Sequence, residues 1–558
     1  MGPLGSATEA ERLKPVRSPL FPLLCGVVVS LLVGQSSGVW FWLGSLGVGL
    51  ATTAACLWVL ARSRGSSDKR VACLFAVLGF LVGWPWLLFQ SEQIPEDWHW
   101  LPARELDLEI EVERLFQVRI EGRAGGLGQV VKAPEVVREL QGHRVSFYLE
   151  TNPEEDDWVP TKRFAGRGIL SYLPATERDS GFDRYLLNQD VHLSFRRGAV
   201  LQIIDPGAAW ARGLLHLRNR CRSLLMSGDG LGYGPVFAAM LLGERALLDP
   251  ERERRFVESG TLHLFAISGL HVMAVAAAVA QVLSLLRIPA VPKGLLGLSI
   301  VLLYVLVTGY SPSAVRAFSM VLCYWVALML RRQANPFAAW VNSALLVLLW
   351  DPRQLWLPGF QLSYGVVGGL ITVAGLMQDR WRNHPDPVDW RPRSLRYRIQ
   401  TLPKDLTNIL KQLFTLSLCA SLFSAPLIIS YFELFSGGAV FLNMILVPLA
   451  GLVVATGCLS LAGGLFLGTW WAAFYNQAAW ILLATMEGLI GLALRLDGYF
   501  HGRVWPWEPT GPLLTFGALL LAAGLREWAR QGRVRPGFAI TAPMALILGG
   551  IILGSVSS

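Results

Sequence analysis

The stretch SGTLHLFAISGLHVMAVAAAVAQVLSLL, Ser259–Leu286, decides the fold class of this chain. It is predominantly apolar and exceeds the ~20 residues that a helix needs to cross the hydrocarbon core of a bilayer. Its first half nevertheless carries His263, Ser268 and His271. Polar side chains inside a membrane span are costly, usually face the interior of a helix bundle and by default indicate function. The stretch therefore predicts a membrane helix with a functional polar end.

The whole chain has the composition of a membrane protein. Of its 558 residues, 53% are hydrophobic and 16% are charged, and the mean hydropathy is +0.44; a soluble domain has about 25% charged residues. Trp favours membrane interfaces and Gly is frequent in membrane helices, which agrees with the 21 Trp and 56 Gly. The seven Cys form no CxxC pair, so we interpret them as small buried hydrophobes. A single soluble enzyme, a disordered chain and a disulfide-stapled secreted domain are excluded.

The apolar runs are interrupted once, by a long polar stretch. Several runs are short, so we expect about 11–13 spans in a polytopic α-helical membrane protein. We predict domains at 1–89 (hairpin and third span), 90–210 (an inserted β domain), 211–260 (interfacial helices), 261–500 (the main membrane domain) and 501–558 (C-terminal spans). The candidate spans are 20–34, 39–61, 71–89, 261–285, 294–309, 313–330, 337–350, 358–377, 412–432, 438–463, 466–494, 511–526 and 537–555.

Basic residues in the predicted loops favour one orientation. The N-terminus carries Arg12, Lys14 and Arg17, whereas the loops at 35–38 and 309–312 have no Lys or Arg. Cytoplasmic loops carry an excess of Lys and Arg, so the N-terminus is expected in the cytoplasm and the 90–210 domain outside it. The net charge of +9 then follows from topology and is not by itself a sign of nucleic-acid binding. The other basic clusters fall on the cytoplasmic side of this topology, at 62–70, 287–293, 331–332, 380–404 and 526–535.

The inserted domain has the pattern of a small β-barrel. Apolar and acidic residues alternate from Leu106 to Glu113, the period of a half-buried strand. Further strands are expected at 118–120, 145–150, 168–173 and 191–204, with Gly-rich turns at 122–128. Five short strands suggest an OB-like fold, a fold that often binds single-stranded nucleic acid.

The charge of this domain restricts where nucleic acid could bind. Residues 101–205 hold 14 Lys and Arg against 18 Asp and Glu, a net charge of −4. Any DNA groove must therefore be local, because phosphate binding depends on basic side chains. A folded platform that does not bind DNA is the equal alternative. The candidate contacts are Lys162, Arg163, Arg167, Arg196 and Arg197.

Further polar residues lie inside or at the start of other spans. Arg316 lies one turn into its span, where it would either snorkel to the interface or face a polar cavity. Pro426 and Pro448 are expected to break or kink their helices. Interrupted spans with polar residues are typical of a conduit rather than an anchor, although helix–helix packing also explains single residues. The remaining candidates for a path are Gln361, Ser363 and Asn443.

The sequence carries no signature of the common enzyme sites. It has no Walker A motif, no HExxH and no Gly-x-Ser-x-Gly. Its eight His never occur as His-x-His, so no metallo-β-lactamase-type site is expected. In a continuous helix His263 and His271 would be ~12 Å apart, too far to share a metal ion. We therefore expect no enzyme activity, no cofactor and no metal.

Five motifs together resemble the ComEC-type competence proteins, the inner-membrane channels for DNA in natural transformation. A sixth segment, Ser180-Gly-Phe-Asp-Arg-Tyr-Leu-Leu187 at the end of the outer domain, also resembles the family's Gly-Phe-Asp segment. In family order the motifs are GERALL (243–248), SGTLHLFAISGLHV (259–272), TGYSPSAVRA (308–317), PGFQLSYGVVGGLI (358–371) and SAPLIISYFELFSGGAVFLNMILVPLAG (424–451).

The resemblance implies a bacterial inner-membrane channel for single-stranded DNA, with an external OB-like domain and a channel over 261–500. It also implies an extracytoplasmic DNA-binding partner and a cytoplasmic helicase-like motor, and leaves a homo-oligomer open. Many members carry a C-terminal metallo-β-lactamase-like domain that this sequence lacks, so a separate nuclease is expected. Two alternatives stay open: a secondary transporter of a small polar solute, and a membrane-anchored protein that binds DNA or a partner.

Overall fold

The structure is a computed structural model that describes most of residues 102–554. The gaps within this range are 119, 121, 152–156, 174–180, 266, 287, 382–394, 497–500 and 506–509, and residues 23–25, 27, 28, 98, 556 and 557 are described as well. The predicted spans 39–61 and 71–89, and most of 20–34, therefore lie outside the described residues. So does the middle of the largest predicted cytoplasmic loop.

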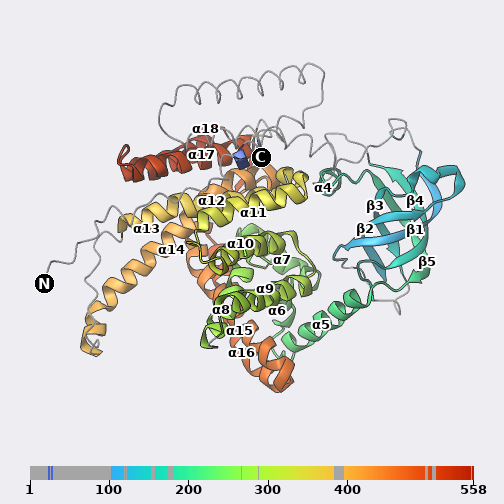
Figure 1. Ribbon diagram of the computed structural model, residues 1–558, viewed down its shortest axis with the longest axis horizontal. Coiled ribbons are helices and arrows are strands. Elements are labelled where there is room, and N and C mark those ends of the chain that lie inside the picture. The colour runs from blue at the N-terminus through green and yellow to red at the C-terminus, as the bar shows by residue number, and fades with distance from the viewer. Residues whose placement is uncertain are drawn as a thin grey trace, which may run out of the picture.

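A closed five-stranded barrel forms the first described domain (Figure 1). The order around it is β1-β2-β3-β5-β4, with β3 and β5 parallel and the other pairs antiparallel. Phe147, Phe164 and Phe195 fill its core. The small barrel predicted for this region is thus confirmed. The strands are β1 (Arg104–Leu115), β2 (Arg123–Lys132), β3 (Arg144–Glu150), β4 (Arg163–Tyr172) and β5 (Leu193–Asp205).

One strand of the barrel differs from the prediction. Residues 122–128 were expected as a Gly-rich turn, but only Gly122 is in a turn, and residues 123–128 form the first part of β2. In the strand expected at 118–120, the described residues Val118 and Ile120 are not in a strand. The glycines are needed for close approach: a Cβ on Gly126 would lie 2.2 Å from the Arg114 carbonyl oxygen, and one on Gly128 would lie 2.7 Å from that of Glu111. Glycine in a strand often marks such a contact.

The rest of the described chain is helical, apart from 3-10 turns and a short sheet of β6 (Leu434–Phe435), β7 (His501–Val504) and β8 (Val556–Ser557). Before the long helices come α4 (Gly181–Leu187), α5 (Ala209–Leu225), α6 (Gly234–Leu242) and α7 (Pro250–Glu258). Then follow α8 (Gly269–Leu285), α9 (Ala290–Val307), α10 (Pro312–Met329), α11 (Pro336–Trp350), α12 (Pro358–Gly369), α13 (Gly375–Trp381), α14 (Leu395–Phe432), α15 (Ala439–Leu467), α16 (Thr469–Ala493), α17 (Thr510–Arg530) and α18 (Pro536–Gly554).

Seven described helical segments are long and apolar enough to cross a membrane. They correspond to predicted spans, which makes the chain a multi-pass membrane protein. Three other predicted spans form helices outside this set: α11, with 15 residues, and the longer α16 and α17. Of the break or kink expected at Pro426 and Pro448, the break does not occur: α14 and α15 each continue through the proline. The seven segments are 262–285, 290–307, 312–329, 358–380, 406–432, 439–467 and 536–554.

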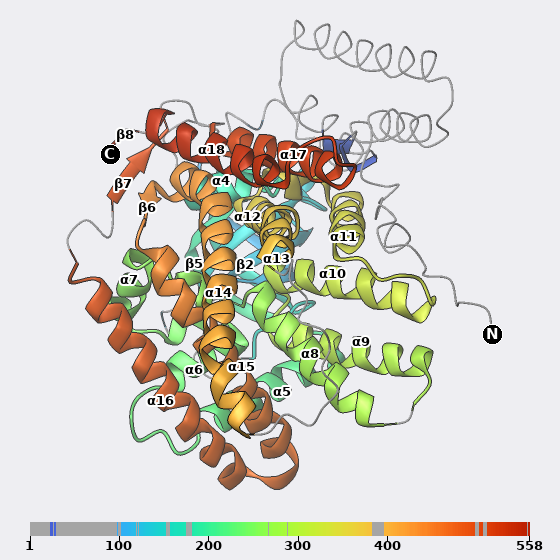
Figure 2. The same ribbon diagram turned by 90° about the vertical axis from the view of Figure 1, so that its left-hand side faces the viewer.

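The barrel sits at one end of the helical region (Figure 1), and in the view turned by 90° it lies behind the helices (Figure 2). Gln117, beyond the end of β1, donates from its side-chain amide to the Gly243 carbonyl oxygen. Asp190, just before β5, pairs with Arg353 at 3.4 Å. The loops at 243–247 and 351–357 therefore lie on the barrel side of the helices. This agrees with the predicted topology, which places the 351–357 loop and the barrel on one side.

Candidate functional site

The chain enters the first polar span through a helix cap, not through a continuous helix. The turn η6 (Leu262–Leu264) ends before Ser268, whose backbone is extended, and α8 begins at Gly269. The Ser268 hydroxyl accepts the backbone N–H of His271, while His271 Nδ1 accepts the Ser268 backbone N–H at 3.1 Å. This is a capping box with histidine in place of the usual Glu or Gln. Ser268 and His271 thus fix the start of α8.

His271 has a second ring nitrogen that the cap does not use. Because Nδ1 accepts a hydrogen bond, the neutral ring carries its proton on Nε2. The side chain is fully buried, and Nε2 has no hydrogen-bond partner among the described residues. An unsatisfied buried donor costs about 1–3 kcal/mol. This N–H group is therefore available to a ligand without disturbing the cap.

His263 lies apart from this cap, in η6. It is exposed, and its Nδ1 is 3.1 Å from the Gly260 carbonyl oxygen. The helix break at Ser268 means that the spacing of a continuous helix does not apply to His263 and His271. Among the residues that the structure describes, no three His, Cys, Asp or Glu side chains gather as a metal-binding group.

Arg316 is buried at the barrel-side end of α10. The residue is only 4% exposed, and its Nε donates a hydrogen bond to Ser363 Oγ of α12 at 3.2 Å. Its terminal nitrogens approach Gly359: a Cβ there would lie 3.0 Å from one and 3.6 Å from the other. Arg316 therefore does not snorkel to the interface, which was one of its two predicted positions.

Gln361 is held by partners on two other elements. Its amide nitrogen donates to the Leu355 carbonyl oxygen at 2.9 Å, and its amide oxygen accepts from the Tyr431 hydroxyl of α14 at 2.8 Å. A buried amide with both ends occupied is a structural link. Gln361 joins α12 to α14 beside the Arg316–Ser363 contact, rather than offering a free group to a substrate.

The predicted path residues therefore fall into connected groups. Arg316, Gln361 and Ser363 share the junction of α10 and α12. That junction adjoins the α8 cap, because a Cβ on Gly269 would lie 3.8 Å from Ala317 Cβ. Asn443 is near the start of α15, which packs on α8. Its side-chain oxygen is buried without a hydrogen-bond partner among the described residues.

Most of the predicted basic contacts on the barrel are already paired. Arg167 binds both carboxylate oxygens of Asp107 at 2.7 and 2.8 Å. This hydrogen bonding lowers the pKa of the Asp107 carboxyl group, so the pair stays ionised and its charges cancel at neutral pH. Three other basic residues also have partners: Arg163 pairs with Glu111 at 3.5 Å, Arg196 pairs with Asp183 at 3.2 Å, and Lys162 donates to the Asp157 carbonyl oxygen at 3.1 Å.

Arg197 is the exception among these five residues. It is exposed, and no hydrogen bond or ion pair joins it to the described part of the chain. Its backbone is left-handed, with a φ of 56°. The local basic groove predicted for the barrel is thus largely neutralised by cross-strand partners, since Asp107 faces Arg167 and Glu111 faces Arg163 in the β1–β4 register.

Two polar residues that sequence reasoning missed are structurally prominent. Asn476 of α16 is fully buried; its amide donates to the carbonyl oxygens of Leu224 and Ser227 at 2.8 and 3.1 Å and so closes the end of α5. The sequence did contain a signal for Asn476, because it is a polar residue inside the predicted span 466–494. Arg114, at the end of β1, interacts electrostatically with Arg316. No spacing along the sequence connects those two arginines.

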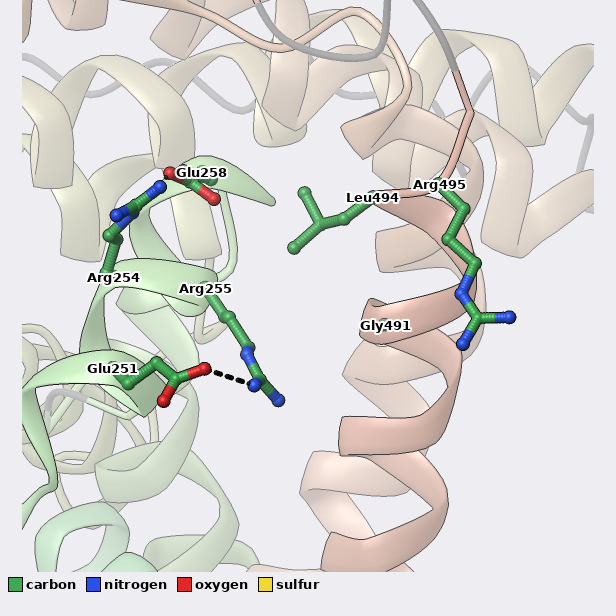
Figure 3. A pocket seen from close by; sticks show the side chains of 7 residues that line it. All are labelled: Glu251, Arg254, Arg255, Glu258, Gly491, Leu494 and Arg495. Carbon is green, nitrogen blue, oxygen red and sulfur yellow. Dashed lines mark hydrogen bonds and ion pairs between the residues drawn. The ribbon is translucent and has the colours of Figure 1, made fainter.

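A separate cleft of about 500 Å3 opens between α7 and the end of α16 (Figure 3). Arg255 pairs with Glu251 at 2.5 Å, and Arg254 pairs with Glu258 at 2.8 Å. Both pairs have the i,i+4 spacing of an exposed helix face, and the Arg495 side chain points away from them (Figure 3). None of the predicted path residues lines this cleft.

Known proteins resemble parts of this chain. Similar relatives include ComE operon protein 3 of Bacillus subtilis, 25% identical over 58% of this chain and 41% of its own length. Competence protein ComA of Neisseria gonorrhoeae is 33% identical over 31% of this chain and 26% of its own length. Recombination protein 2 of Haemophilus influenzae is 26% identical over 39% of this chain and 28% of its own length. The chain spans less than half the length of these curated relatives. No solved structure matches it.

The family comparison covers the same region as the site. The model of the family described as "Competence protein" matches residues 240–530, more than half of the chain. This range includes the α8 cap, the junction of α10 and α12, and Asn443. The chain therefore belongs to the competence protein family.

Proposed function

We propose that this chain takes part in DNA uptake during competence, and that it forms the inner-membrane channel through which single-stranded DNA reaches the cytoplasm. Arg316 carries the proposal. It is a buried cation inside a span, and no carboxylate of the described residues pairs with it. Buried charges are normally paired, so a polyanion passing the barrel-side end of the spans would supply the missing negative charge.

The polar groups around Arg316 support a path rather than an anchor. The α8 cap leaves His271 Nε2 free, and Asn443 leaves a side-chain oxygen free among the described residues. These groups lie on packed helices within the region that matches the family model. Hydrogen bonds to phosphate and sugar do not read sequence, so we propose that transport tolerates any sequence.

We further propose that the barrel is OB-like and lies on the extracytoplasmic side. Its strand order, with β3 parallel to β5, supports a Greek-key barrel of this kind. The basic clusters of the predicted loops support the orientation. In this proposal an external DNA-binding protein delivers the DNA, a separate nuclease removes one strand, and a cytoplasmic helicase-like motor pulls the other. The chain itself acts as a conduit and not as an enzyme.

A deletion strain tests the proposal with labelled duplex DNA that carries a selectable marker. We expect no transformants, and label that accumulates in a nuclease-resistant compartment outside the inner membrane. The wild-type gene on a plasmid should restore transformation and abolish the accumulation of label. Normal transformation of the deletion strain in a competent host would refute the channel, and would favour the alternative of a small-solute transporter.

A further inference from the structure

The junction between the barrel and the helices holds two guanidinium groups without acidic partners. Arg316 donates from Nε to Ser363, and its two terminal nitrogens have no hydrogen-bond acceptor among the described residues. Arg114 of β1 interacts electrostatically with Arg316 and donates to the Tyr185 hydroxyl at 3.2 Å. It too lacks a carboxylate partner in the described chain. Two like charges repel each other, and the buried Arg316 also bears a cost of desolvation.

The buried guanidinium is aimed at the start of a helix. Gly359 is the second residue of α12, a helix of 12 residues that begins with Pro358. The Cβ that Gly359 lacks would be 3.0 Å from an Arg316 terminal nitrogen. In this first turn Pro358 has no N–H group, and the N–H groups of Phe360 and Gln361 donate to the Leu357 carbonyl oxygen. The Gly359 N–H group and the positive end of the helix dipole remain to favour an anion. The Arg316 guanidinium group and the helix dipole therefore act on the same place with the same sign.

We propose that Arg316 and the N-terminus of α12 form a binding site for a phosphodiester anion. A guanidinium group suits a phosphate because two of its N–H groups can bind two oxygens. The phosphodiester can come from the DNA backbone or from a phospholipid headgroup. The DNA source rests on the function proposed above, whereas the lipid source does not.

The DNA arm uses the full chain in nanodiscs and a fluorescent oligodeoxythymidine. The Kd is measured over a series of salt concentrations. Each phosphate contact in a single strand contributes about 0.7 to the slope of log Kd against log salt. We expect Arg316→Gln to lower the slope by about 0.7. Arg332→Gln, which changes an exposed arginine at the far end of α10, should leave the slope unchanged.

A second variant keeps the Arg316 charge and obstructs the space beside it. Gly359→Ala places a methyl group against the Arg316 guanidinium, and we expect the slope to fall as in Arg316→Gln. Gly517→Ala is its matched control, because a Cβ at Gly517 meets nothing within 4 Å. A slope that falls with Arg316→Gln but not with Gly359→Ala would overturn the site at the start of α12, and an equal fall with Arg332→Gln would indicate a general charge effect and overturn it as well.

The lipid arm uses native mass spectrometry of the same proteins. If the anion is a headgroup, the wild type retains a phospholipid that Arg316→Gln and Gly359→Ala lose, and the DNA slope does not change. Unchanged DNA slopes together with unchanged lipid retention would overturn the site. If the wild type binds no oligodeoxythymidine and the deletion strain transforms normally, the channel fails, while the lipid result still decides the site.

Discussion

His271 serves the fold through one ring nitrogen and leaves the other free. Nδ1 completes the cap of α8, which explains a histidine in an apolar span without any ligand. The cap does not explain why a ring was needed, because Glu or Gln completes the same box. The unpartnered Nε2–H group is what distinguishes His271 from those residues. The two roles can therefore be separated by substitution.

His271→Gln should keep the cap and remove Nε2–H, whereas His271→Ala should remove both. We expect the Ala variant to lose about 1 kcal/mol of stability, the value of a helix cap, and the Gln variant to keep its Tm. A hydrogen bond to a charged group is worth about 1.5–3 kcal/mol, so transformation should fall about tenfold or more in both. The measurements are Tm in detergent and transformants per cell at equal membrane level. Transformation at the wild-type level by His271→Gln would show that His271 only caps α8 and that its Nε2–H group has no role in transport.

Asp107→Asn tests whether cross-strand pairing masks a DNA-binding face of the barrel. The substitution frees Arg167, which the Asp107 carboxylate now neutralises. If this face contacts DNA, oligonucleotide binding should tighten, and the salt slope should rise by about 0.7. Glu135→Gln, an exposed acidic residue outside the strands, is the control. An unchanged slope would favour the barrel as a platform without DNA contacts.

At the scale of the elements, glycines set how closely the helices pack. A Cβ on Gly369, at the end of α12, would lie 2.4 Å from the ring of Phe423 in α14. Small residues allow such contacts between membrane helices. This contact and the Gln361–Tyr431 hydrogen bond join the same two helices. The place of α12 beside α14, and hence of Ser363 beside Arg316, depends on both.

Gly369→Ala should force Phe423 or the helix backbone to move. Overpacking of this kind costs about 1–3 kcal/mol, so we expect a lower Tm of the purified protein. Gly524→Ala in α17 controls for the added methyl group, because a Cβ there meets nothing within 4 Å. Equal Tm values for the two variants would contradict the close packing of α12 on α14.

The sequence predicts elements better than it predicts contacts between them. Alternation places Leu108, Ile110 and Val112 in the barrel core as expected, because burial on one face has a period of two. The glycines of β2 were wrongly predicted as a turn, because glycine occurs both in turns and in strands where two backbones approach closely. Arg316 was identified by the cost of a cation in a span. Its neighbour Arg114 comes from another domain and has no local signal.

At the scale of the molecule, the barrel marks one side of the membrane domain. Arg316, at the start of α10, interacts with Arg114 of the barrel. α10 has 18 residues, or about 27 Å of helix, close to the thickness of the hydrocarbon core. Arg331 and Arg332, which follow it, therefore lie on the opposite side. Basic residues flanking a span favour the cytoplasm, so the barrel is expected outside.

Cysteine labelling in whole cells tests this orientation. In a variant without the native cysteines, Arg197→Cys places a thiol at an exposed site of the barrel, and Arg332→Cys places one at an exposed site beyond α10. A membrane-impermeant maleimide should label the first in intact spheroplasts and the second only after lysis. Labelling in the reverse order would put the barrel in the cytoplasm. Arg316 would then contact DNA at the exit of the path instead of at its entrance. The same experiment therefore decides at which end of the path Arg316 lies.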